Sequence, residues 1–311
     1  MKRRSFLKKT SLGAGLLTAG SFPLAAFDKP EVIKLTILHT NDVHSRIEAF
    51  PMDGGRMQGL GGAAKRATLL EQIRKVEKHT LLLDAGDIFQ GTPYFNYFGG
   101  ELEFKLMSAM KYDVATIGNH DFDAGIDGLA KQLPKAKFSF VNCNYDLSDT
   151  ILHDKVKPYK IFRKGSLKIG VLGVGIELAG LVPENLYKKT RYLDPIAKAN
   201  QHAAILKHDE NCDYVICLSH LGYKYKEDKI SDIALAKQSE DIDLILGGHT
   251  HTFLEQPDQI LNKKDRPVII NQVGWAGIML GRLDVYFERN FKDKCVTCNN
   301  IFIGESVKSK K

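Results

Sequence analysis

The sequence predicts an α/β fold, and three observations support this prediction. Short apolar runs of strand length alternate with segments of helical periodicity, which is typical of α/β domains. Several of these runs end in a turn that carries a histidine, aspartate or asparagine. Of the 311 residues, 43% are apolar and 26% are charged, so the chain can bury a substantial core without special stabilising devices.

The elements follow from these patterns in chain order. Strands are expected at the apolar runs 35–39, 80–84, 114–117, 138–142, 169–174, 214–218, 244–246, 268–271 and 281–287. A helix is expected at 63–76, where Ala63, Leu70 and Ile73 lie on one apolar face together with Ala67 and Leu69.

A second helix is expected to begin at Asp194, because Pro195 suits the first helical position. We find no internal repeat and no long low-complexity linker. One catalytic domain is therefore expected within residues 27–311, with its core at about 33–288 and a short C-terminal tail.

The first 26 residues have the composition of an export signal. Arg3 and Arg4 precede Ser5-Phe6-Leu7, which is the form of a twin-arginine signal, and a modestly apolar stretch follows as far as Ala26. This stretch is too short and polar to span a bilayer, so no stable membrane anchor is expected in the mature protein. We expect a protein exported to the periplasm or the extracellular side. The alternatives are the general secretory route or an ordinary basic N-terminus.

The net charge of +7 does not indicate a nucleic-acid partner. Residues 1–26 contribute five basic residues and no acidic one, which leaves +2 of the total for the remaining chain. No basic stripe is evident, so nucleic acid is not expected to bind.

The five cysteines are not expected to carry the chemistry. Cys143 and Cys217 lie in apolar runs and are expected to be buried, unreactive thiols. Cys295 and Cys298 have the spacing of a metal or redox motif but lack a second pair, so a local disulfide or two free thiols are expected there.

Five expected strands end in a turn with a side chain that can bind a metal ion. These side chains are Asp42, His44, Asp87, Asn119, His220, His249 and His251. Ligands gather at the carboxyl ends of the strands in open α/β sheets, so the five turns are expected to converge. Each motif alone could arise by chance, but their combination indicates a metal site. Oxygen and imidazole ligands without thiolate suit Mn²⁺, Zn²⁺, Fe or Co²⁺.

Together these motifs resemble those of the calcineurin-like metallophosphoesterase superfamily. The segments concerned are Asp42-Val43-His44, Gly86-Asp87, Gly118-Asn119-His120-Asp121, His220 and Gly248-His249-Thr250-His251. Within this superfamily the chain resembles the bacterial 5′-nucleotidase family. The shared segments are Thr40-Asn41-Asp42-Val43-His44, Asp87 with Gln90-Gly91-Thr92-Pro93, and Asn119-His120-Asp121-Phe122-Asp123. The resemblance covers about residues 35–287 and implies a four-layer α/β/β/α sandwich of the metallo-dependent phosphatase type.

The resemblance also implies a site for two divalent metal ions. One ion would be held by Asp42, His44 and His251, and the other by Asn119, His220 and His249, with Asp87 as a bridge between them. Two ions about 3.5–4 Å apart lower the pKa of a shared water, and the resulting hydroxide attacks the phosphorus.

A histidine–aspartate pair beside the ligands is expected to act in acid catalysis. The resemblance implies that His120, oriented by Asp123, donates a proton to the departing oxygen. An ordinary surface pair is the alternative. Asp121 stands where the family usually has a glutamate.

The expected function is hydrolysis of a small phosphoester, most simply a nucleotide. 5′-Nucleotides, UDP-sugars and 2′,3′-cyclic nucleotides are the candidates. The alternatives are a thiosulfohydrolase-like hydrolase of sulfur compounds, and a catalytic or non-catalytic subunit of a split nucleotidase.

Family 5′-nucleotidases carry a C-terminal nucleotide-binding domain, which is expected to be absent here. A separate chain is therefore expected to supply it, unless aromatic loops of this chain stack on the base. The aromatic residues of these loops are Phe89, Tyr94, Phe95, Tyr97, Phe98, Tyr223 and Tyr225. The alternative is that these side chains only pack in the interior.

Overall fold

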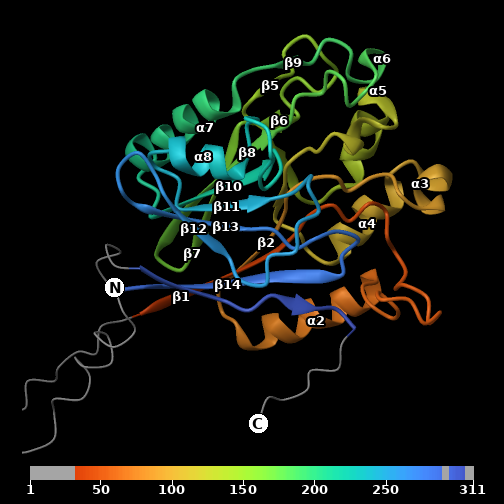
Figure 1. Ribbon diagram of the computed structural model, residues 1–311, viewed down its shortest axis with the longest axis horizontal. Helices are drawn as coiled ribbons and strands as arrows, with labels where there is room; N and C mark the ends of the chain where they lie inside the picture. Colours follow the sequence, from red (N-terminus) through yellow and green to blue (C-terminus); the bar gives the residue numbers. More distant parts are fainter. Residues whose placement is uncertain (1–31, 289–293, 305–311) are drawn as a thin grey trace, which may run out of the picture. The chain divides into compact units, whose positions relative to one another are not determined.

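Two β-sheets packed face to face form the centre of the structure, a computed structural model that describes residues 32–288 and 294–304 (Figure 1). The first sheet has the order β15-β14-β1-β2-β3-β4-β6, and β16 also pairs with β14. Its strands are β1 (Ile33–Thr40), β2 (Thr80–Asp84), β3 (Val114–Ala115), β4 (Ser139–Val141), β6 (Val156–Lys157), β14 (Met279–Phe287), β15 (Lys294–Cys298) and β16 (Ile301–Phe302). The strands β1, β2, β3, β4 and β6 run parallel, and β14 is antiparallel to β1.

The second sheet has the order β12-β13-β11-β10-β8-β7. Its strands are β7 (Tyr159–Lys164), β8 (Leu167–Gly175), β10 (Tyr214–His220), β11 (Leu244–Gly247), β12 (Asp258–Leu261) and β13 (Pro267–Asn271). The central four are parallel, and the edge strands β7 and β12 are antiparallel to their neighbours. A small separate ladder joins β5 (Tyr145–Asp146) to β9 (Arg191–Tyr192).

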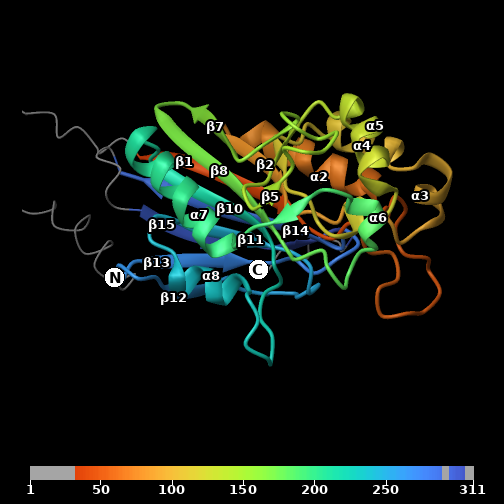
Figure 2. The same cartoon turned by 90° about the horizontal axis from the view of Figure 1, so that it is seen from above.

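Helices cover the outer face of each sheet (Figure 2). The helices are α2 (Ala63–Val76), α3 (Pro93–Phe98), α4 (Glu101–Ala109), α5 (Gly125–Gln132), α6 (Glu184–Tyr187), α7 (Pro195–Ala204) and α8 (Asp232–Gln238). Short 3₁₀ turns lie at His120–Phe122 and Leu133–Lys135, and a π-helical turn at Ile205–Asp209 extends α7.

Three apolar clusters correspond to the three contacts between these four layers. Between the sheets, Leu35 and Ile37 of β1 pack with Ile216 and Leu218 of β10. Leu38, one residue out of phase, faces the opposite side and packs with α2, α4 and α5. The third cluster joins the outer face of the second sheet to α7 and α8. The arrangement is the predicted α/β/β/α sandwich, and the alternation along β1 follows from the two-residue period of a strand.

All nine expected strands are present. The expected helix at 63–76 has the bounds of α2, and the Asp194 side chain caps α7 by accepting hydrogen bonds from the backbone N–H groups of Ile196 and Ala197. The strand expected at 114–117 ends earlier, at Ala115, because the chain there turns toward the site.

The structure bears on the membrane prediction but not on the predicted signal peptide. The expected signal peptide lies outside the part of the chain that the structure describes. Within that part, none of the helices has the length and apolar character needed to cross a membrane.

Candidate metal centre

The predicted ligands come together at the carboxyl ends of strands from both sheets. Asp42 and His44 follow β1, Asp87 follows β2 and Asn119 follows β3, all in the first sheet. His220 is the last residue of β10, and His249 and His251 follow β11, both in the second sheet. Two groups of these side chains have the spacing of metal ligands: Asp42, His44 and His251, and Asp87, His220 and His249. The predicted convergence of the five turns is thus confirmed.

In the first group, two imidazoles and a carboxylate point at one another. His44 Nε2 lies 3.0 Å from His251 Nε2, and Asp42 Oδ1 lies 3.4 Å from His251 Nε2 and 4.0 Å from His44 Nε2. Two ring nitrogens and a carboxylate oxygen at this spacing are the donor set of a cation such as Zn²⁺ or Mn²⁺.

The second group is linked to the first through Asp87. Its Oδ2 atom lies 3.1 Å from His220 Nε2 and 3.8 Å from His44 Nε2, so one carboxylate faces both groups. Asn119 joins the second group, since its Oδ1 lies 2.9 Å from Nδ1 of His249.

Hydrogen bonds to the backbone fix which nitrogen of two histidines is free. His220 Nδ1 donates to the carbonyl of Ala85 at 2.7 Å, and His44 Nδ1 donates to the carbonyl of Phe89 at 3.2 Å. A carbonyl accepts only, so in both neutral rings the lone pair resides on Nε2. This is the usual arrangement of metal-binding histidines.

His220 Nε2 is the strongest sign that a cation belongs here. The side chain is wholly buried, and apart from the Asp87 carboxylate 3.1 Å away, Nε2 meets no group among the described residues in hydrogen-bond geometry. Burying a polar atom without a well-formed hydrogen bond costs free energy, and a bound cation at Nε2 would offset that cost. The donor set around it fits a divalent metal.

Burial and the neighbouring charges have opposite effects on the pKa values of His220 and Asp87. Burial disfavours a charged His220, but the Asp87 and Asp42 carboxylates raise its pKa to about 10. Burial likewise opposes ionisation of Asp87, yet His220 and His44 lower the pKa of this carboxyl well below its usual range. The protein alone therefore stabilises Asp87 as an anion, ready for a cation.

Five of the seven predicted ligands have left-handed backbone conformations. They are Asp42 (φ 50°), His44 (φ 51°), Asp87 (φ 56°), His249 (φ 72°) and His251 (φ 53°). Aspartate and histidine tolerate this region better than most residues, but it is still strained, and such strain concentrates at functional sites. The turns therefore direct these side chains inward at a local energetic cost.

Three glycines let the loops approach closely. Gly86 has φ +90°, and an added Cβ would lie 2.7 Å from the Gly118 nitrogen. At Gly118 a Cβ would lie 2.2 Å from Asp87 Oδ1, and at Gly248 it would lie 2.9 Å from His220 Nδ1. Of the three, only Gly86 has a positive φ, and the other two permit close packing.

Asp121, the residue that departs from the family pattern, ties two ligand loops together. Its buried carboxylate accepts backbone hydrogen bonds from Gly118 at 2.8 Å, Asp87 at 3.1 Å, Ile88 at 2.9 Å and Phe89 at 3.2 Å. The shorter side chain thus orients the loop that carries Asp87, without itself reaching the ligand groups.

His120 and Asp123 form the predicted pair at the rim of the site. His120 Nδ1 and Asp123 Oδ2 are 2.8 Å apart, and this hydrogen bond raises the pKa of His120. The His120 ring lies edge-on to His44, with centroids 5.2 Å apart, and its side chain is 39% exposed. A protonated imidazole is therefore available next to the ligands and open to a substrate.

A pocket of roughly 360 Å³ leads to the ligands. Its walls include three of the predicted residues, His44, His120 and His251, and two that sequence reasoning missed, Arg46 and Trp275. Trp275 stacks on the His251 ring with an interplanar angle of 11° and a centroid distance of 5.7 Å. Trp275 is the only tryptophan of the sequence, but it lies 24 positions after His251, so no short sequence motif links the two residues.

The loop aromatics separate into two groups. Phe89 and Phe95 are buried in the core, so for them the packing alternative is correct. Tyr223 and Tyr225 are half-buried, and their hydroxyls donate to Asp258 and to the Leu221 carbonyl.

The remaining aromatics lie on or beside α3 at the surface. Tyr94 and Tyr97 line a second pocket of roughly 390 Å³, and Phe98 is half exposed and stacks on Tyr94. Of the loop aromatics, Tyr94 and Tyr97 line a pocket, and Tyr97 and Phe98 are the most exposed.

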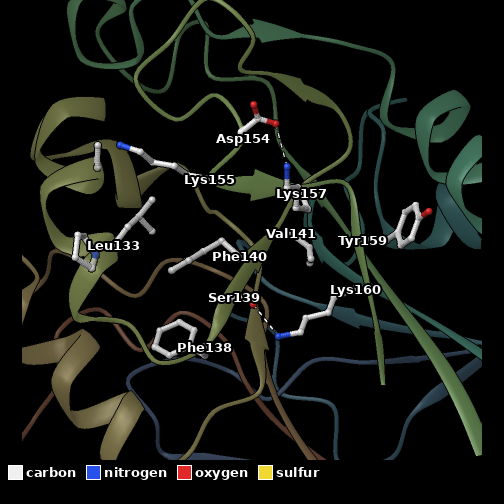
Figure 3. Close-up of a pocket in the computed structure, with 12 residues that line it drawn as sticks. Leu133, Phe138, Ser139, Phe140, Val141, Asp154, Lys155, Lys157, Tyr159 and Lys160 are labelled. Atoms are coloured by element: carbon white, nitrogen blue, oxygen red, sulfur yellow. Dashed lines mark hydrogen bonds and ion pairs between the residues drawn. The ribbon is translucent and has the colours of Figure 1, made fainter. Parts of the chain in front are cut away.

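A third pocket, of roughly 620 Å³, lies elsewhere and contains none of the predicted site residues (Figure 3). Phe138 and Phe140 form part of its floor. The two lysines that Figure 3 shows in dashed contacts are already paired, Lys157 with Asp154 at 3.0 Å and Lys160 with Ser139 at 2.8 Å.

The cysteines lie outside the candidate centre. Cys143 and Cys217 are buried as predicted, and burial raises the pKa of the Cys143 thiol to about 12. Cys295 and Cys298 are free thiols three residues apart on β15. Alternation places them on opposite faces, with Cα atoms roughly 10 Å apart, too far for a disulfide. The expectation of a local disulfide is therefore wrong, and that of free thiols is correct.

Comparisons with known proteins agree with this geometry. Residues 35–253 match the calcineurin-like phosphoesterase family, whose members use divalent metals. A 5′-nucleotidase from the venom of Naja atra is 33% identical over 294 aligned positions, covering 88% of this chain and 54% of the venom protein.

Two solved structures have the same fold. The 5′-nucleotidase precursor of Thermus thermophilus has a TM-score of 0.78 at 29% identity, over 87% of this chain and 55% of that one. The NAD nucleotidase of Haemophilus influenzae has a TM-score of 0.77 at 30% identity, over 88% and 57%. The chain spans about half the length of the curated relatives it matches. It belongs to the calcineurin-like phosphoesterase family, as a metallophosphoesterase related to the 5′-nucleotidases.

Proposed function

We propose that this chain hydrolyses phosphoesters of nucleotides with two divalent metal ions. The observation that carries the proposal is the pair of adjacent ligand groups, in which the Asp87 carboxylate lies 3.1 Å from His220 Nε2 of its own group and 3.8 Å from His44 Nε2 of the other. One ion would be held by Asp42, His44 and His251. The other would be held by Asn119, His220 and His249, and Asp87 would contact both ions. The donor set suits Mn²⁺, Zn²⁺, Fe or Co²⁺.

Such ions, when bound, activate a water molecule and neutralise phosphate oxygens. The residues of the chain supply the remaining chemistry. His120, open to the pocket and held by Asp123, would donate a proton to the departing oxygen. Trp275, stacked on the His251 ring, would help to hold that ring in place.

A nucleotide is the substrate class that the relatives support, since several are named 5′-nucleotidases or NAD nucleotidase. A separate chain with a nucleotide-binding domain is the proposed partner. Copurification of such a chain from the native source would support it, and full nucleotidase activity of the isolated monomer would contradict it.

The decisive experiment is a phosphate-release screen of the metal-loaded chain. Nucleoside monophosphates, UDP-sugars and 2′,3′-cyclic nucleotides are incubated with wild type, with Asp87→Asn and with Asp149→Asn, a surface control whose side chain is 57% exposed. We expect turnover that Asp87→Asn abolishes and Asp149→Asn preserves.

The other outcomes identify the alternatives. Release of sulfate from thiosulfonate compounds, without release of phosphate, would indicate the sulfur-compound hydrolase. Metal binding without turnover of any substrate would indicate a non-catalytic subunit.

We also propose that the protein is exported through a twin-arginine signal in residues 1–26, which are cleaved near Ala26 to leave the catalytic domain at 27–311. The support is the Arg3-Arg4 pair and the apolar stretch that follows it. Replacing both arginines with lysines tests the route: we expect the protein to accumulate in the cytoplasm, and undiminished export would contradict the proposal.

A further inference from the structure

Arg46 stands where two pockets meet. The first pocket contains His44, His120 and His251 of the candidate centre, and the second contains Tyr94 and Tyr97 of the α3 surface. Only Arg46, Gly91 and Thr92 line both. A substrate that extends from the metal ligands toward α3 must therefore pass the Arg46 side chain.

The Arg46 guanidinium has no acidic partner among the described residues. Its Nε is buried without a hydrogen-bond acceptor among these residues, and the guanidinium carbon lies 4.2 Å from the centroid of the Phe50 ring. The nearby acid Glu48 instead accepts a hydrogen bond from the Tyr94 hydroxyl at 3.0 Å. A guanidinium charge without an acidic partner at the wall of two pockets favours binding of an anion from solution through its terminal N–H groups.

Aromatic rings connect this cation to the ligand groups. Phe50, under the guanidinium, packs edge-on against Trp275 with centroids 5.9 Å apart, and Trp275 in turn stacks on His251. Because Phe50 contacts the flat face of the guanidinium, the terminal N–H groups at its edge can still donate hydrogen bonds to a ligand. A guanidinium held this way presents the paired donors that bind phosphate oxygens.

We propose that Arg46 binds a second phosphate of the substrate, adjacent to the one that is hydrolysed. The inference rests on the proposed function and names its preferred substrate class: nucleoside diphosphates and nucleotide sugars, whose two phosphates are linked. The phosphate to be hydrolysed lies beside the ligands His44 and His251, which line the first pocket and not the second. The second lies at Arg46, at the boundary of the two pockets.

The second pocket then receives the rest of the substrate. Tyr97, 83% exposed, offers a ring face for stacking, and Glu48 can accept hydrogen bonds from sugar hydroxyls. The negative charge of Glu48 opposes a third phosphate there. Two linked phosphates therefore match the charges along this path better than three.

Calorimetry on the metal-loaded full chain tests the proposal without turnover. The probes are methylenediphosphonate, which cannot be hydrolysed between its phosphorus atoms, and inorganic phosphate. Arg46→Gln is expected to weaken diphosphonate binding by about 10- to 100-fold, the effect of losing one charge-assisted contact, and to change phosphate binding less than about twofold. Arg163→Gln, an exposed arginine on β7, is the matched control and is expected to change neither.

Two results would overturn the assignment. Unchanged diphosphonate binding by Arg46→Gln would show that Arg46 holds no phosphate. Equal weakening of both probes would place Arg46 on the phosphate that is hydrolysed. The melting temperature of each variant confirms that it is folded.

An activity measurement separates this proposal from the proposed function. Arg46→Gln is expected to lower kcat/KM for a nucleoside diphosphate by a similar factor and that for the monophosphate much less. If the wild type hydrolyses neither, the proposed function fails while the calorimetric result still decides the role of Arg46.

Discussion

His120 is the residue whose role depends most directly on exposure and hydrogen bonding. It faces the pocket, is paired with Asp123 and lies outside both ligand groups. We expect His120→Asn to bind metal as the wild type does but to lose about 10²–10⁴ in kcat with a nucleotide, whose leaving oxygen needs a proton.

The same variant should lose much less with a nitrophenyl phosphoester, because nitrophenolate leaves without protonation. Metal content by emission spectroscopy and steady-state kinetics on both substrates measure the difference. Equal losses on the two substrates would remove His120 from the role of proton donor.

Asp121 is predicted to stabilise the site through the backbone. Asp121→Asn keeps the volume but replaces one of two accepting oxygens with a donor that faces backbone N–H groups. We expect a loss of about 1–3 kcal/mol in the free energy of unfolding, together with weaker metal binding. Urea unfolding and metal titration check both, and a variant as stable as the wild type would show that these hydrogen bonds carry little energy.

Sequence reasoning found the residues that stand in motifs and missed those defined by contacts. The seven predicted ligands and His120 follow strand ends at short spacings, so local patterns were enough to nominate them. Arg46 and Trp275 lie 229 positions apart in the sequence, and Phe50 contacts both of them in the fold. Nothing local in the sequence encodes such a contact.

At the scale of elements, an ion network joins β1, the end of α2, and β14. Lys34 contacts Glu77 at 2.7 Å and Asp284 at 3.2 Å, and Arg282 contacts both acids. Partial burial favours the neutral acids, but the two cations lower the pKa of Glu77 below its usual value, and the Thr36 hydroxyl together with the two cations does the same for the pKa of Asp284. Stability from a carboxyl with a lowered pKa is present at neutral pH and is lost as the pH falls through about 4 and below.

Glu77→Gln should therefore lower the free energy of unfolding at pH 7 by about 1–2 kcal/mol, because two partly buried cations lose a shared partner. The difference from wild type should shrink between pH 5 and pH 3. Urea unfolding at several pH values measures it. Glu71→Gln, which breaks an exposed pair on the same helix, is the control and should cost only a few tenths of a kcal/mol. A difference that stays constant with pH would contradict the prediction.

The elements predicted from the sequence are those with a continuous apolar run, for strands, or a regularly repeating apolar face, for helices. The helix α2 and the strands of both sheet centres are of this kind. The edge strands β7 and β12 were missed because half-buried edges mix polar and apolar residues without a continuous run. The short helices α3 and α4 escaped because α3 has only six residues and Gly100, rather than a polar cap, precedes α4.

At the scale of the whole molecule, metal binding should stabilise the contact between the two sheets, since each sheet contributes ligands. Removing divalent ions with a chelator should lower the melting temperature by about 5 °C, the effect of losing a ligand present at about 100 times its Kd. Scanning calorimetry with and without chelator measures this shift. Asp87→Asn should show a much smaller one, and a wild type insensitive to chelation would argue against a metal in this centre.

The pairing of β1 with β14 determines when the protein can finish folding during its synthesis. Ile33 is opposite Phe287 in this ladder, so about 250 residues must be translated before β1 gains its second neighbour. At 5–20 residues per second this takes roughly 10–50 s, during which β1 remains an open edge that other chains can join. A ribosome paused before residue 251 would hold a chain with an incomplete ligand set. Metal capture by nascent chains would therefore mark the last stage of translation.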